Sequence, residues 1–473
     1  MTSHRSISRC AGPLDRRTWL KVGGLSLGSL VSGVSPNLAS LLASEAQAGS
    51  AATTDKKFSV ILFWANGGPS HLETFDPKPL MKQYDDQLLP ESLRDFDLAQ
   101  INTADSKVMA PVFPFKKYGE SGQDISGIFP FLAQHADKLA IIRSMYHDLF
   151  IHGSAMTIMH SGTRLLGHPS IGSWVVYGLG CESNNLPAYV AMTDGIFRNG
   201  ASMYSSGFLP AIYQGTHLRT QGAPIQNLSR PRNITESEQR MLLDYLHRWN
   251  TRHLESRPGD SRLNARIANY ELAFRMQSAA PDLINLSQET KHTRDLYGVD
   301  EEPTQRFGKM CLLARRMVER GVRYVQLISG GWDAHGDVKG NHETQGKKVD
   351  KPIAGLISDL HARGLLESTQ LVWVGEFGRT PIMQGTNGRD HHPYGFSAWM
   401  AGGGVTGGQT IGKTDDFGFA AVEDKVHVND LHATMLGLMG IDHKALTYLF
   451  EGRHRRLTDV GGDNNLVKRL TRT

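Results

Sequence analysis

Short apolar runs recur between residues 58 and 402, and longer stretches in which apolar residues return every three or four positions separate them. Each run holds about five to eight residues and is apolar almost throughout, as is typical of strands that are buried on both faces of a sheet. The pattern predicts strands at 58–65, 139–145, 188–192, 323–329, 371–375 and 396–402.

The stretches between the runs predict amphipathic helices at 129–138, 170–180, 304–321 and 353–364. Strands that alternate with helices form a parallel sheet covered on both faces, because each parallel connection crosses over the sheet. We therefore expect an α/β protein, a three-layer α/β/α sandwich with a mainly parallel sheet, over residues 56–460. Residues 203–300 interrupt the alternation with polar and long helical patterns, so we expect a helical insertion there.

The first fifty residues differ from the rest of the chain. Arg16 and Arg17 precede a weakly apolar run broken by Gly and Ser, and the small-residue site Ala46-Gln47-Ala48 follows. This order predicts a twin-arginine signal peptide over residues 1–48, cleaved after Ala48, and export to the periplasm or cell envelope. No later run is long and apolar enough to span a bilayer, so no stable membrane insertion is expected after cleavage.

Composition narrows the class of protein further. The 473 residues carry 51 Lys and Arg against 47 Asp and Glu, and the formal net charge is +4. So small and dispersed an excess, without a signature motif, predicts no nucleic-acid binding. Signal cleavage would remove Cys10 and leave Cys181 and Cys311. Because Cys311 lies in a helical pattern typical of a buried thiol, no disulfide scaffold is expected.

Polar side chains follow several predicted strands, at the sheet edge where α/β proteins build their sites. After the first strand, Asn66, Gly67 and Gly68 allow a tight turn. The backbone N–H groups of this turn either cradle an anion or only close the turn.

The segment that follows the second strand predicts a helix containing His152, Thr157 and His160. Ser154 lies near the start of this helix, where free N–H groups and the helix dipole favour an attacking oxyanion or a bound anion. The alternative is that Ser154 caps the helix and His160 packs in the interior.

Two further strand ends carry groups that suit a metal ion. The segment GGWDAHGD, residues 330–337, places Asp333 and His335 directly after a strand, and carboxylate and imidazole are good metal ligands. Arg379 suits an oxyanion such as phosphate or sulfate, or else it pairs with Glu376 and locks its loop. The candidates after the strand at 371–375 are Glu376, Arg379, Asp390, His391 and His392.

Several segments together resemble the DUF1501 family of the alkaline phosphatase-like superfamily, which also contains sulfatases and phosphoglycerate mutases. They occur in order across residues 58–445 and are specific for that family. The segments are NGGPSHLETFDPKP (66–79), IIRSM (141–145), GGWDAHGD (330–337), GEFGRTP (375–381), GRDHHP (388–393), AGGGVTGG (401–408), IGKTDDFG (411–418) and VNDLHATMLGLMGID (428–442).

The resemblance implies one or two metal ions between strand ends. Asp333 and His335 match the superfamily's middle Asp and His, His391 or His392 matches its late His, and the region of Ser154 or Thr157 lies where a nucleophile would. The chain also departs from the pattern. Asn66 replaces the first acid among the metal ligands, and Glu376-Phe377 replaces an Asp-His pair, which lowers the expected cation affinity. The sulfatase signature around a cysteine is absent, so a true sulfatase mechanism is not expected.

We expect an exported hydrolase-like protein in which one divalent ion (Zn, Ca or Mg) assists hydrolysis of a phosphate or sulfate ester, small or borne by a polysaccharide. Asp333, His335, Asp390 and His391 or His392 would hold the ion. Two alternatives remain open: a non-catalytic binding protein that keeps the anion cleft, and a structural envelope component. Arg379 would neutralise the oxyanion, and Ser154, Thr157 or a water would attack the ester. His152 would act as a ligand or as general acid and base. Glu376 would orient a histidine or bind the ion, and Asn66 is a further candidate ligand.

Overall fold

The computed structural model describes residues 58–93, 105–220, 224–225, 228–257, 260–462 and 465–471. The predicted signal peptide, with Arg16, Arg17 and the site after Ala48, lies outside the described residues.

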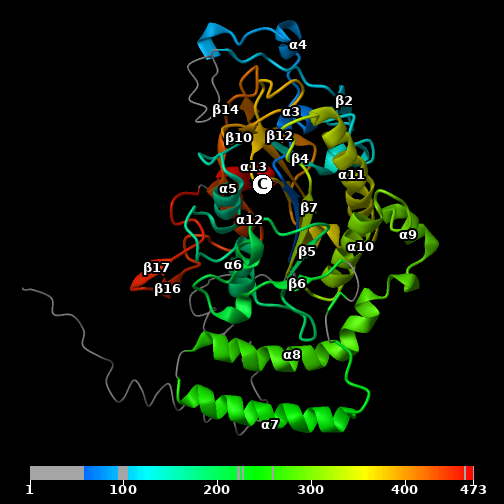
Figure 1. Ribbon diagram of the computed structural model, residues 1–473, viewed down its shortest axis with the longest axis vertical. Coiled ribbons are helices and arrows are strands. Elements are labelled where there is room, and N and C mark those ends of the chain that lie inside the picture. The colour runs from blue at the N-terminus through cyan, green and yellow to red at the C-terminus, as the bar shows by residue number, and fades with distance from the viewer. Residues whose placement is uncertain are drawn as a thin grey trace, which may run out of the picture. The chain divides into compact units, whose positions relative to one another are not determined.

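A single large sheet organises the described chain (Figure 1). Its strand order is β12-β4-β11-β8-β1-β7-β5-β6, and β15 pairs with β4 beside this path. Every pairing is parallel except those of β11, which runs antiparallel to both β4 and β8. The strands are β1 (Ser59–Asn66), β4 (Ala140–Tyr146), β5 (Tyr189–Thr193), β6 (Thr216–Leu218), β7 (Tyr324–Gly330), β8 (Thr369–Val374), β11 (Phe396–Ala401), β12 (Gln409–Ile411) and β15 (Val426–His427).

Helices cover both faces of the sheet. Along β1, successive side chains point to opposite faces, so Phe63 joins a core with α10 (Gln305–Glu319) and α11 (Val338–Ala362). Its neighbour Trp64 joins a second core, on the other face. The helices of that face are α5 (His152–Ser161), α6 (Ile171–Leu179) and α12 (Val428–Leu438). The predicted mainly parallel α/β fold with three layers is confirmed.

The six strands predicted from apolar runs are all present, within two residues at each end. Two helix predictions differ from the structure. Residues 129–138 form a 3₁₀ helix, η3 (Leu132–Lys138), rather than an amphipathic α-helix. The helix predicted at 353–364 is the C-terminal part of α11, which already begins at Val338 and continues through Pro352. As predicted, Cys311 is buried in α10.

Residues 203–300 contain mainly helix but also β6, which extends the central sheet beside β5. The long helices α7 (Glu236–Glu255) and α8 (Ser261–Ile284) pack against each other as a hairpin at one end of the molecule (Figure 1). A shorter helix, α9 (Lys291–Tyr297), leads back to α10 and α11. The boundaries predicted for the domain and the insertion stay a prediction.

The remaining elements are short. They are α3 (His71–Thr74), α4 (Met81–Tyr84), η1 (Glu91–Leu93), η4 (Gly200–Tyr204), η5 (Ala211–Tyr213), η6 (Leu286–Gln288), η7 (Leu366–Ser368), α13 (Asn465–Leu470) and the paired strands β2 (Phe115–Tyr118) with β3 (Gln123–Ser126), β9 (Gly378–Arg379) with β10 (His391–His392), β13 (Lys413–Thr414) with β14 (Ala421–Glu423) and β16 (Tyr448–Phe450) with β17 (Arg453–Arg455). Within the described ranges, none of the helices combines the length and the apolar character needed to cross a membrane.

Candidate metal centre

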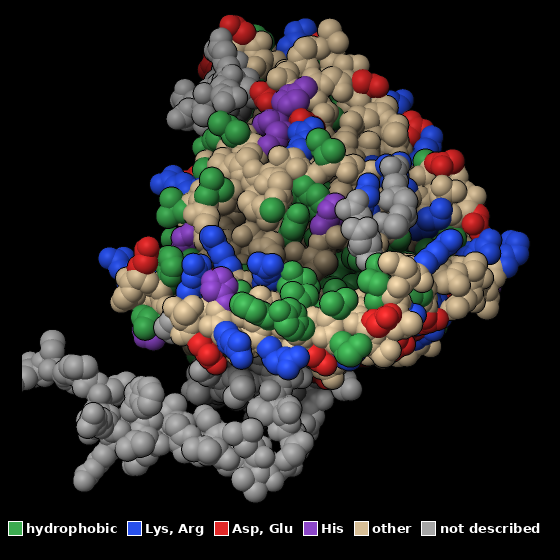
Figure 2. Space-filling model, turned by 60° about the horizontal axis from the view of Figure 1, so that its bottom comes forward, with side chains coloured by type: hydrophobic (Ala, Val, Ile, Leu, Met, Phe, Trp, Pro, Cys, Tyr) green, Lys and Arg blue, Asp and Glu red, His purple; other side chains and the backbone are tan. Residues whose placement is uncertain are grey.

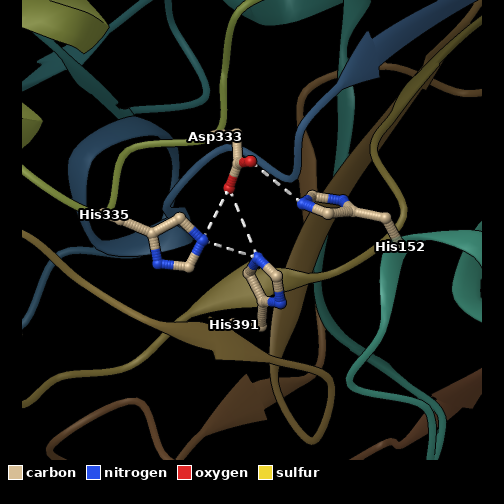
Figure 3. Close-up of side chains that lie close together, drawn as sticks. All are labelled: His152, Asp333, His335 and His391. Carbon is tan, nitrogen blue, oxygen red and sulfur yellow. Dashed lines mark hydrogen bonds and ion pairs between the residues drawn. The ribbon is translucent and has the colours of Figure 1, made fainter. Parts of the chain in front are cut away.

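Four side chains from three separate segments converge at the carboxyl ends of the strands (Figure 3). His152 begins α5, Asp333 and His335 follow β7, and His391 lies on β10. One ligand atom of each side chain lies within 4.8 Å of those of the other three. The Nε2 atoms of His152, His335 and His391 are 3.1, 3.0 and 3.3 Å from the Asp333 carboxylate.

Close backbone packing beneath the cluster explains the glycines after β1. Gly67 has φ +122°, and a Cβ there would lie 2.4 Å from the Asp333 backbone nitrogen. The Asn66 carbonyl accepts a hydrogen bond from the Trp332 N–H at 3.2 Å. Only glycine leaves room for the Asp333 loop to rest on this turn, so the glycine signal is accounted for by close packing.

All three cluster histidines are oriented in the same way. Nδ1–H of His152 donates to the Glu376 carboxylate at 2.7 Å. Nδ1–H of His335 donates to the Gln384 side-chain oxygen at 2.6 Å, and Nδ1–H of His391 donates to the Phe150 carbonyl at 2.8 Å. Each ring is therefore anchored through Nδ1 and points Nε2 toward the common point. Such outward anchoring of Nδ1 is typical of metal-binding histidines.

The Nε2 atoms of His335 and His391 are only 3.0 Å apart. Two neutral nitrogens whose lone pairs face each other repel, so a proton or a cation must lie between them. Burial disfavours an imidazolium, but hydrogen bonds to Asp333 and Glu376 outweigh burial and raise the pKa of His152. By contrast, burial lowers the pKa of His391. One cation bound at the common point would satisfy all four ligand atoms at once.

Asp333 is the centre of charge in the cluster. Burial would raise its pKa, but hydrogen bonds from His152, His391 and Arg379 hold the pKa far below its usual range, so the side chain is a carboxylate. Arg379 donates to its Oδ1 atom at 2.6 Å and Arg198 to its Oδ2 atom at 3.0 Å. A permanently ionised carboxylate next to three imidazoles is a strong ligand set for a divalent ion.

Two buried arginines hold the loop that carries His391. Arg379 is fully buried, and it also donates to the carbonyls of Gly67, Gly68 and Arg389. Arg389 is fully buried too and pairs with Glu73 at 2.8 Å. Four of the five N–H groups of Arg379 are used in these contacts, which make it a brace for Asp333.

Three predicted candidates lie around the cluster but outside it. Glu376 bonds His152 from behind and accepts the Gly67 N–H at 2.8 Å, as a residue that orients a histidine does. Asp390 lies 3.7 Å from His335 Nδ1, on the side away from Nε2. Asn66 is buried, and its Oδ1 atom has no hydrogen-bond partner among the described residues.

His392 points to the opposite side of its strand from His391. In β10, His392 pairs with Gly378 of β9 and His391 pairs with Arg379. Side chains of neighbouring residues on a strand point to opposite sides. The His392 ring is buried and bonded to the Phe419 carbonyl, and burial lowers its pKa to about 4. Of the adjacent histidines, the structure brings only His391 to the cluster.

The predicted nucleophiles lie on α5 close to His152. The Ser154 hydroxyl donates to the Ile151 carbonyl at 3.1 Å, and the Thr157 hydroxyl donates to the Gly153 carbonyl at 2.7 Å. Within the described part of the chain, neither is hydrogen bonded to the cluster. His160 faces the interior, where its Nδ1 bonds the Met156 carbonyl, so it does not share the site with His152.

Sequence reasoning missed Arg198, whose side chain is 39% exposed while it contacts Asp333. It lies after β5 in the segment TDGIFRNG, which also follows a parallel strand. Following that strand to its end would have found it, because β5 ends at the same sheet edge as β7.

The family of the chain is shown by its sequence. The family described as "Protein of unknown function (DUF1501)" matches residues 57–470, so the chain belongs to the DUF1501 family. None of the curated proteins matches the sequence.

Among solved structures, the chain is similar to a sulfatase from Pseudoalteromonas sp., with 12% identity over 88% of this chain and 76% of that one, at a TM-score of 0.35. It is similar to a protein in the alkaline phosphatase superfamily from Vibrio parahaemolyticus (8% identity, 88% and 78% coverage, TM-score 0.35). It is also similar to alkaline phosphatase from the Antarctic bacterium TAB5 (10% identity, 82% and 99% coverage, TM-score 0.34). At such low scores nothing about activity follows from the similarity.

Proposed function

We propose that His152, Asp333, His335 and His391 bind one divalent ion, and that this exported protein uses it to hydrolyse a phosphate or sulfate ester, small or borne by a polysaccharide. The observation that carries the proposal is the convergence of three Nε2 atoms on one carboxylate while every Nδ1 is anchored elsewhere. When bound, the ion would supply Lewis-acid polarisation of the ester oxygen and activation of water.

The ligand set selects among the expected ions. Three imidazole nitrogens and one carboxylate oxygen suit Zn²⁺ or a neighbouring late first-row ion. Ca²⁺ and Mg²⁺ prefer ligand sets made only of oxygen. Zn²⁺ is therefore the ion we propose.

Arg198 is the residue that best fits recognition of the ester anion. Its guanidinium is partly exposed and contacts Oδ2 of Asp333, whereas Arg379 is buried among backbone carbonyls. A planar guanidinium matches two oxygens of a phosphate or sulfate group. We assign to Arg198 the oxyanion role that the sequence suggested for Arg379.

Water is the attacking group that the hydrogen bonds favour. The hydroxyl protons of Ser154 and Thr157 are already donated to helix carbonyls. In the proposed reaction the oxygen of water bonds to phosphorus or sulfur, the bond to the ester oxygen breaks, and the alcohol leaves with a proton.

A non-catalytic, metal-dependent binding protein is the second candidate. It is favoured by one observation: both arginines at the site already bond Asp333, and no described side chain is placed as a free general base there. Such a protein would bind the anionic ester through the ion and Arg198 without turning it over.

Metal analysis of the purified protein, with hydrolysis of generic aryl phosphate and aryl sulfate esters, tests the proposal. We expect one zinc per chain, lost in Asp333→Ala and His391→Ala and retained in His361→Ala, which changes an exposed histidine of α11. Zinc binding together with hydrolysis supports the enzyme, and zinc-dependent sulfate or phosphate binding without turnover supports the second candidate. Absence of stoichiometric metal overturns both.

Export is tested separately on the full-length chain. Replacing Arg16 and Arg17 by lysine should retain the protein in the cytoplasm, because twin-arginine transport depends on the arginine pair. Unchanged export of this variant would rule out the twin-arginine route.

A further inference from the structure

The outer face of α7 carries a row of exposed apolar side chains. They recur at spacings of three and four residues, so they lie on one stripe of the helix. Figure 2 turns this end of the molecule forward and shows hydrophobic side chains gathered there among charged ones. The exposed fractions are 63% for Met241, 52% for Leu242, 52% for Tyr245, 39% for Leu246 and 56% for Trp249.

The opposite face of α7 is already used by the hairpin. Leu243 is its buried residue, and Arg240 pairs with Glu271 of α8 at 2.9 Å while it lies over the Phe274 ring. The orientation of α7 is therefore fixed, and the exposed stripe is not a helix face waiting to turn inward. Among the described residues nothing covers it.

Charge is distributed unevenly along α7. The N-terminal half carries Glu236, Glu238 and Asp244. Its basic residue, Arg240, forms ion pairs with Asp244 and Glu271. The C-terminal half carries Arg248, Arg252 and the histidines at 247 and 253 against a single acidic residue, Glu255. Two such helices attract each other when antiparallel, because each acidic half then meets a basic half, and repel when parallel.

We propose that a second copy of this chain covers the stripe, as a homodimer in which the two α7 helices pack antiparallel about a two-fold axis. The axis passes near Tyr245 and Leu246, the middle of the helix, so Leu242 meets the partner's Trp249. A two-fold interface requires one self-complementary patch, and the stripe with its charge gradient is such a patch. The inference does not depend on the proposed metal site.

The size of the stripe is compatible with a dimer. Five large side chains that are about half exposed each offer on the order of 100 Å². Two copies would then bury roughly 1,000 Å² from the stripe alone, the lower limit for a specific interface, and the flanking charged residues add to it. An exposed apolar patch of this size is often an interaction site.

Sedimentation velocity of the mature protein tests the proposal. We expect a dimer for the wild type and for Leu166→Glu, a control at another exposed leucine (75%) far from α7 in sequence. The double variant Leu242→Glu with Leu246→Glu should raise the dimer dissociation constant by at least about 100-fold, since each subunit would bring two charges into an apolar interface. Circular dichroism should show an unchanged fold, because both leucines point outward. A monomeric wild type, or a variant that remains dimeric, overturns the proposal.

Disulfide trapping tests the orientation, with Cys181→Ser as background because that thiol is only partly buried. Mixing Leu242→Cys and Trp249→Cys proteins should give the mixed disulfide in preference to either homodisulfide. Preference for the Leu242→Cys homodisulfide would show parallel helices and overturn the antiparallel arrangement. If the protein is monomeric and other parts of the same chain shield Trp249 from solvent, the stripe forms an internal contact and the dimer proposal is wrong.

Discussion

The strand-end cluster and the α7–α8 hairpin hold charge in opposite ways. Around the cluster, Arg379, Arg389 and Glu73 are fully buried, and each has several fixed partners. In the hairpin, the pair of Arg240 and Glu271 is partly exposed, while large apolar side chains face water. Buried charged groups are stable only where they are paired and hydrogen bonded. The residues around the cluster are therefore held rigidly, as a site for chemistry requires. The hairpin, which keeps its ions outside, offers an apolar surface suited to association.

The largest effect is expected from breaking the buried pair beneath the cluster. Glu73→Gln leaves the Arg389 charge uncompensated in the interior, and we expect a loss of about 3–5 kcal/mol in the free energy of unfolding. The same change in the hairpin, Glu271→Gln, should lower the free energy of unfolding by less than about 1 kcal/mol. Denaturant unfolding of both variants checks this, and equal losses would remove the contrast between the two regions.

A second contrast lies in the pH dependence of stability. Burial raises the pKa of Asp350 on α11 from 3.8 to about 7, although it accepts the N–H groups of Phe131 and Leu132. The folded state thus keeps a proton that the unfolded state has released, so this stability is present at low pH and is lost as pH rises from 3.8 through about 7.

Relative to Asp350→Asn, the wild type should therefore lose about 2–3 kcal/mol of unfolding free energy between roughly pH 5 and pH 8. Glu271 should behave in the opposite sense. Its hydrogen bonds from Arg240 lower its pKa, so its contribution is present above 4.5 and is lost as pH falls. Unfolding curves from roughly pH 3 to pH 8 cover both titrations, and a flat difference between wild type and Asp350→Asn would contradict the first assignment.

Zinc affinity measures how far the cluster depends on residues behind its ligands. Glu376→Gln keeps the shape of the side chain but weakens the acceptor that fixes His152, so we expect a roughly 10- to 100-fold lower affinity. Competition with a fluorescent chelator gives the dissociation constant. Gln239, on α7, provides the control: Gln239→Glu should leave the affinity unchanged, and a shift of similar size there would point to a nonspecific effect of charge.

The smallest effect on stability is expected at Arg198, the exposed arginine of the cluster. Arg198→Ala should change the unfolding free energy by less than about 1 kcal/mol and leave the zinc content unchanged. Binding of inorganic phosphate or sulfate to the zinc-loaded protein should weaken roughly 10-fold, because a charged hydrogen-bond donor is lost. Calorimetric titration checks this. Unchanged anion binding would mean that a residue other than Arg198 binds the oxyanion.

The sequence predicted the strands that are long and apolar and missed those that are short and polar. β6, β12 and β15 hold two or three residues each and are stabilised by pairing with longer neighbours, a tertiary effect that no local pattern carries. The first half of α11 was missed for a similar reason. Its sequence KGNHETQGKK is polar, so no apolar stripe marks it as helix.

The candidate site was predictable as far as strand ends define it. Asp333 and His335 follow β7 directly, the adjacent histidines lie in the segment that joins β8 to β11, and the structure brings three of these four side chains together with His152. What the sequence left open was geometry. Only the β9–β10 pairing decides between His391 and His392, and only the packing of Arg379 against backbone carbonyls shows that Arg198 is the freer guanidinium.

The reversed strand β11 has a consequence for how the molecule could vary. Because β11 runs back beside β8, residues 375–395 leave and re-enter the sheet at neighbouring positions of one edge. That segment carries Glu376, Arg379, Asp390 and His391, yet a change in its length would not displace any of the parallel strands. Buried Arg379 and Arg389 fix the base of this segment, so the part that could vary in length while the strands beneath it fold as before is its exposed tip, residues 385–387.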